Sequence, residues 1–74
     1  MRFFENAISM FKISHQVLGP SAPTSYNLGL CFIGLGNTSE ALAFMIEACK
    51  LDPTFEPAKL SRERLEQSPP PNQG

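Results

Sequence analysis

Apolar residues recur at spacings of three and four along the amino-terminal segment, which is the period of an amphipathic helix. These positions are Phe4, Ala7, Ile8, Phe11, Ser14 and Leu18. They predict a helix over about residues 2–18, which Gly19 and Pro20 end. Further apolar residues widen the stripe beyond the ~100° that one contact face needs: Phe3, Met10, Ile13 and Val17. We therefore expect this helix to need neighbours on two sides.

Start and stop signals predict three more helices. Pro23 suits a first helical turn, and Gly36 suits the residue just after a helix. Asn37, followed three positions later by Glu40, is the pairing of a capping box. Pro53 stops the helix that this box starts. The predicted ranges are about 22–35, 38–51 and 55–67.

The last predicted helix differs from the others because its apolar stripe is narrow and lies beside a charged face. The stripe consists of Phe55, Ala58, Leu60 and Leu65. A helix that closes an array of helices is expected to have such a polar outer face. The residues that follow, SPPPNQG, cannot continue a helix, so 68–74 is expected to be a disordered Pro-rich tail.

A shift of 34 positions aligns the first predicted helix with the third by residue size. The aligned pairs are Ala7 with Ala41, Ile8 with Leu42, Met10 with Phe44, Phe11 with Met45, Ser14 with Ala48 and Val17 with Leu51. Small residues fall on small ones and large apolar residues on large ones. This agreement indicates that the two helices have equivalent places in a repeated structure.

In this register the chain resembles the tetratricopeptide repeat family. The matching positions are Leu28 and Gly29 for the Leu-Gly pair, Phe32 for the following aromatic, Ala41 for the small residue of the second helix, and Pro53 for the closing proline. Ala7 and Phe11 match the Ala and Phe positions of a preceding repeat. The chain departs from the pattern at Ser25, where the family usually has Trp, and at Met45, where it usually has Phe.

The resemblance implies an all-α fold of three to four antiparallel helices in right-handed repeat packing. It divides the chain into the second helix of a partial repeat, one full repeat, a capping helix and the tail: 1–21, 22–55, 56–67 and 68–74. Roughly three repeats are normally needed for stability, and this chain has fewer. It is therefore expected to be a piece or an end of a longer array, or a subunit that completes itself by pairing.

The resemblance also implies a binding site. In the family, the first helix of each repeat lines a concave groove that receives extended peptides or helices. The positions that would face it here are Pro23, Tyr26, Asn27, Leu30, Ile33 and Gly34. None is charged, so an apolar or amphipathic peptide or helix is the expected partner, with Tyr26 as a polar handle. Alternatively, these side chains pack beneath an adjacent helix, including one from a second copy.

Composition and charge narrow the functional classes. The net charge is −1, and the six Lys and Arg residues are scattered, so nucleic-acid binding is not expected. Between Lys12 and Glu40 no residue is charged, which predicts extensive burial or an apolar surface. The longest apolar run, 28–35, is too short to cross a bilayer, so no membrane association is expected.

The chain contains few groups that could carry catalysis. Cys31 and Cys49 fit neither a disulfide framework nor a zinc pattern, which favours buried thiols in the cytoplasm or another reducing compartment. His15 is the single histidine and lacks a neighbouring carboxylate in the sequence. No catalytic, metal or cofactor site is therefore expected, and a cysteine-based enzyme is the weakest alternative.

Two hypotheses for the function remain. The first is a non-enzymatic scaffold for protein–protein interaction that binds its partner through the groove at Tyr26, Asn27, Leu30 and Ile33. The second is self-association, as a homodimer or as an element of a longer array, through an open apolar surface of the first helix. This surface consists of Phe3, Phe4, Met10 and Ile13.

Overall fold

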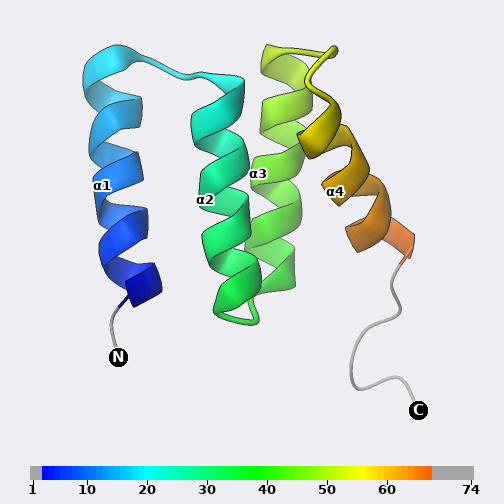
Figure 1. The fold of residues 1–74 in the computed structure, drawn as a ribbon, viewed down its shortest axis with the longest axis horizontal. Coiled ribbons are helices and arrows are strands. Elements are labelled where there is room, and N and C mark those ends of the chain that lie inside the picture. Colours follow the sequence, from blue (N-terminus) through cyan, green and yellow to red (C-terminus); the bar gives the residue numbers. More distant parts are fainter. Residues whose placement is uncertain (1–2, 68–74) are drawn as a thin grey trace.

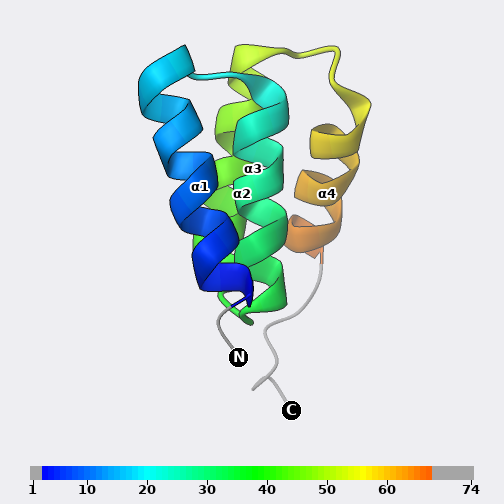
Figure 2. The ribbon, with the colours of Figure 1, turned by 60° about the vertical axis from the view of Figure 1, so that its left-hand side comes forward.

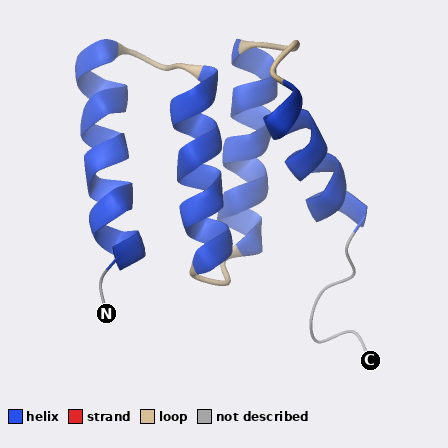
Figure 3. Cartoon of the chain, viewed as in Figure 1, coloured by secondary structure: helices blue, strands red, loops and turns tan. Residues whose placement is uncertain are grey.

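The computed structural model of the chain describes residues 3–67 and is helical, with no strand in that range (Figure 3). The helices are α1 (Phe3–Leu18), α2 (Ala22–Gly34), α3 (Thr38–Leu51) and α4 (Glu56–Gln67). The predicted all-α fold is confirmed, and each predicted helix lies within one residue of its position in the structure. The predicted disordered tail, 68–74, lies outside the described residues.

The helices form a row in chain order, and successive helices run in opposite directions (Figures 1 and 2). The array is flat, with extents of 43 × 34 × 13 Å. Helix α2 packs against α1 on one side and α3 on the other, and it also meets α4. Because three helices contact α2, its sequence has to satisfy three interfaces.

Local hydrogen bonds explain the sharp turn between α2 and α3. Gly36 has a φ of 80°, which favours glycine, and its N–H donates to the carbonyl of Ile33. The N–H of Asn37 donates to the carbonyl of Phe32 at 2.8 Å, which completes a Schellman motif. The side chain of Asn37 accepts from the N–H of Glu40 at 3.3 Å, which is one of the two bonds of the predicted capping box.

The core consists of two apolar clusters that share α2. One lies between α1, α2 and α3 and is built on Ile8, Leu28 and Cys31, with aromatic side chains from all three helices around it. The other lies between α2, α3 and α4 and is built on Ala22, Met45, Ala48 and Ala58. The second cluster contains mostly small residues, so the helices around it can approach closely.

Helices α2 and α3 approach each other closely at Gly29. A Cβ atom at this position would lie 2.7 Å from Cε of Met45 and 3.3 Å from the carbonyl oxygen of Ala41. Both Met45 and Ala41 are completely buried. Glycine on α2 and alanine on α3 therefore let the two backbones approach, and Met45 fills the remaining space.

This packing predicts that enlarging Ala41 destabilises the protein, whereas the same change elsewhere on α3 has little effect. We expect Ala41→Leu to lower the free energy of unfolding by about 1–3 kcal/mol because the extra atoms have no space. The matched control is Ala43→Leu at an exposed position of the same helix, with an expected change within about 0.5 kcal/mol. Urea unfolding followed by circular dichroism measures both, and equal effects would contradict the packing.

Candidate protein-binding groove

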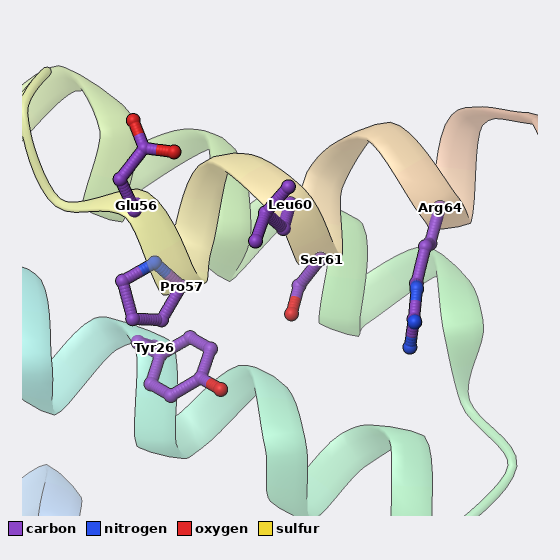
Figure 4. Close-up of a pocket in the computed structure, with 6 residues that line it drawn as sticks. All are labelled: Tyr26, Glu56, Pro57, Leu60, Ser61 and Arg64. Atoms are coloured by element: carbon purple, nitrogen blue, oxygen red, sulfur yellow. The ribbon is translucent and has the colours of Figure 1, made fainter.

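A groove with a volume of about 400 Å³ lies between α2 and α4 (Figure 4). One side is the ring of Tyr26 on α2, and the other is formed by residues of α4. The lining residues of α4 are Glu56, Pro57, Leu60, Ser61 and Arg64. In Figure 4, Ser61 and Arg64 extend toward α2, while the carboxylate of Glu56 points away from the tyrosine ring. Most of the groove surface is apolar, and its polar groups are two hydroxyls, one guanidinium and the carboxylate of Glu56.

Packing fixes the orientation of Tyr26. Its ring lies edge-on to that of Phe55, with ring centroids 5.6 Å apart and an interplanar angle of 74°. Phe55 immediately precedes α4 and packs on the cluster that joins α2, α3 and α4. The tyrosine ring is thus held by Phe55, and it also lines the groove. This arrangement leaves a rigid aromatic surface with a hydroxyl at its rim.

The other predicted groove residues lie along α2. Leu30 and Ile33 follow Tyr26 by four and seven positions, so they continue its face of the helix, and they are 40% and 39% exposed. They are not among the side chains that line the groove itself, and neither is Asn27, which is half-buried. The groove therefore combines Tyr26 with α4, and Leu30 and Ile33 form an exposed apolar strip beside it on α2.

Sequence reasoning missed the contribution of α4, including its cation. Only positions on α2 were assigned to the groove, and these carry no charge. The shift of 34 positions contains the missing signal, because it places Leu60 on Tyr26 and Arg64 on Leu30. Within residues 3–67, no carboxylate lies within ion-pair distance of the Arg64 guanidinium. Arg64 thus adds a positive charge without an ion-pair partner among these residues to the wall of the groove that also carries Glu56.

A polar cluster on the other side of α2 also escaped the sequence analysis. The buried Ser25 hydroxyl donates to Oε2 of Glu47 at 2.6 Å, and Nε2 of His15 lies 3.5 Å from the same oxygen. The carboxylate occupies the middle of the cluster, so the hydroxyl bonds to it instead of to the imidazole. This is not the order of a serine–histidine–acid site, in which the imidazole must take the proton of the serine. The cluster joins α1, α2 and α3.

The residues predicted for self-association occupy two different places on α1. Phe3, Met10 and Ile13 are among the most exposed apolar side chains of residues 3–67. Phe4 is half-buried instead, and its ring occupies the space where a Cβ atom on Gly34 would lie. Phe4 therefore contributes to the packing of α1 on α2, while the other three residues face away from it.

Both cysteines are free thiols, and they differ in exposure. Cys31 is buried in the cluster between α1 and α2, whereas Cys49 on α3 is half-buried. Burial raises the pKa of the Cys31 thiol, because the apolar surroundings disfavour the charged thiolate. A raised pKa lowers the thiolate fraction near neutral pH, and the thiolate is the nucleophilic form.

Comparisons with known proteins found no family model, no curated protein and no solved structure that matches the chain significantly. In the part of the chain that the structure describes, no three His, Cys, Asp or Glu side chains are grouped so that they could hold a metal ion. No helix among residues 3–67 has both the length and the hydropathy needed to span a membrane.

The environment of Cys31 predicts slow alkylation. In a Cys49→Ser variant, Cys31 should react with iodoacetamide at pH 7 far more slowly than free glutathione, because its thiol is buried and mostly protonated. In the matched variant Cys31→Ser, the more accessible Cys49 should react faster. Urea should abolish the difference, and mass spectrometry measures both rates. A Cys31 that reacts faster than glutathione in the folded protein would instead indicate an activated nucleophile.

Proposed function

We propose that the chain is a non-enzymatic protein-interaction module with helices stacked as in tetratricopeptide repeats. In this proposal α2 and α3 form one full repeat, α1 is the second helix of a preceding repeat, and α4 is a capping helix. The module binds an apolar or amphipathic peptide or helix along α2, at the groove that α2 shares with α4. The observation that carries the proposal is the apolar groove beside the exposed strip of α2.

Burial along the repeat register supports the stacking. Leu28, Ala41 and Ala48 occupy small or apolar positions of the family pattern, and all three are at most 1% exposed. The contact of α2 with α4 also supports it, because the first helices of consecutive repeats are neighbours on the groove side of such an array. Two free thiols favour a reducing compartment such as the cytoplasm.

The groove also favours one kind of partner. Leu30 and Ile33 supply an apolar strip, and the Tyr26 hydroxyl supplies a hydrogen-bonding group. Arg64 has no carboxylate partner among residues 3–67 and can form a charge-assisted hydrogen bond with an acidic group of the ligand. We therefore propose that the preferred ligand has an apolar face flanked by an Asp, a Glu or a terminal carboxylate.

Selection of peptides on the immobilised protein tests this function. Peptides with an apolar face and a nearby carboxylate should be enriched from a phage-displayed random library. Tyr26 is the single tyrosine and there is no tryptophan, so tyrosine emission reports directly on the groove when a selected peptide without Tyr or Trp binds. Leu30→Glu should weaken binding by at least ~30-fold, because it places a charge in the apolar contact.

The matched control is Leu51→Glu on α3, since Leu51 is 43% exposed and lies outside the groove. It should leave both peptide binding and the helical circular-dichroism signal unchanged. The proposal fails if no peptide is enriched, or if Leu30→Glu stays folded and still binds the selected peptide with the original affinity. Loss of helical signal in Leu30→Glu would place Leu30 in the core and would also contradict the proposal.

A further inference from the structure

The side of α1 away from α2 has an apolar surface that no part of residues 3–67 covers. We define the outer stripe as the four side chains Phe3, Met10, Ile13 and Val17, whose exposed fractions lie between 59% and 74%. Phe3, Met10 and Val17 are separated by seven residues, and Ile13 lies between the last two. This is the spacing of a helix that packs along its length against another helix.

The internal repeat shows what such a surface does elsewhere in this chain. The shift of 34 positions places Met10 on Phe44 and Ile13 on Glu47. On α3, these two residues contact α2. The ring of Phe44 stacks on that of Phe32 with centroids 5.5 Å apart, and Glu47 accepts the hydrogen bond of Ser25. The central part of the outer stripe, Met10 and Ile13, therefore occupies the face that α3 uses to pack against a helix.

The exposed area of the outer stripe is comparable to one side of a small interface. The four side chains leave roughly 500 Å² uncovered, against the ~800 Å² per partner of a standard interface. One copy thus exposes roughly 60% of the area that each partner of a standard interface buries. A patch of roughly this size is the largest apolar patch that a typical monomer exposes, and such patches often have a function.

The charges on α1 favour a second copy over other occupants. The polar residues beside the stripe are neutral: Asn6, Ser9 and Gln16. The only Asp, Glu, Lys or Arg residues of α1 are Glu5 and Lys12, which have opposite signs. An anionic membrane or nucleic acid would require a cluster of cations, which α1 lacks. Two neutral apolar stripes meet without like-charge repulsion.

Within a second copy, α1 is a better match than α4. Helix α2 contacts α3 through Ser25, Gly29 and Phe32. The shift of 34 positions places Lys59, Glu63 and Glu66 of α4 on these three residues, in that order. Helix α4 therefore carries charges at the positions where a further helix would dock. Packing the outer stripe against them would bury charges among apolar groups, which is costly. Head-to-tail chains of α1 on α4 are accordingly disfavoured.

We propose that the chain forms a twofold homodimer in which the outer stripe of α1 packs against the same stripe of a second copy. Such a contact stops at two copies, because both copies use the same stripe and neither has a second one for a third copy. The interface lies at the opposite end of the array from the groove, so it goes beyond the proposed function and leaves the groove open.

Sedimentation equilibrium of the full chain tests the proposal. We expect a monomer–dimer equilibrium with most of the protein dimeric at about 100 µM, where a pair with a micromolar dissociation constant is saturated. The variant Met10→Glu with Ile13→Glu should raise the dissociation constant at least ~30-fold, since it removes two central apolar contacts. Its circular dichroism should show the same helix content, because both side chains face away from α2.

The matched control is Leu60→Glu in the groove, which is 56% exposed and lies on α4. It should remain dimeric while losing the selected peptides, so failure of the dimer and failure of the groove are distinguishable. If the double variant does not fold, Val17→Glu near the end of α1 replaces it with the same expected monomer. The proposal is overturned if the wild-type protein is monomeric at all concentrations, even if that monomer captures another protein through the stripe. It is also overturned if a stripe variant folds and stays dimeric.

Discussion

The close approach of α2 to α3 determines most of this structure. It depends on the missing side chain of Gly29 and on the small, fully buried Ala41 and Ala48. With backbones this near, one flexible side chain, Met45, can fill the remaining volume. A small protein buries proportionally little surface, so a tight contact of this kind is one of the few ways to define the relative positions of its helices.

Around this contact, the surface divides into an apolar strip on α2, an apolar stripe on α1 and a charged face on α4. Helix α2 is held by three other helices, and its remaining exposed face is the apolar strip beside the groove. At the two ends of the array, α1 exposes an apolar stripe and α4 exposes charges. The array therefore has one apolar end and one charged end.

The helices could be predicted because their signals are local. The turn at Gly36, the cap at Asn37 and the spacing of apolar residues act within a few positions, and each helix lies within one residue of its predicted range. The groove could be predicted only in part, because Arg64 and Tyr26 are brought together by packing and not by proximity in sequence. The bond of Ser25 to Glu47 also spans two helices and has no local signal.

The most direct test of the packing of α2 on α3 is a nuclear Overhauser experiment on protein with labelled methionine methyl groups. The account predicts strong cross-peaks between the Met45 methyl group and the α-protons of Gly29, because the side chain lies against that backbone. The exposed Met10 methyl serves as the internal reference and should show no contact with α2. A Met45 methyl with the chemical shift of an unstructured chain and no cross-peak to Gly29 would contradict the account.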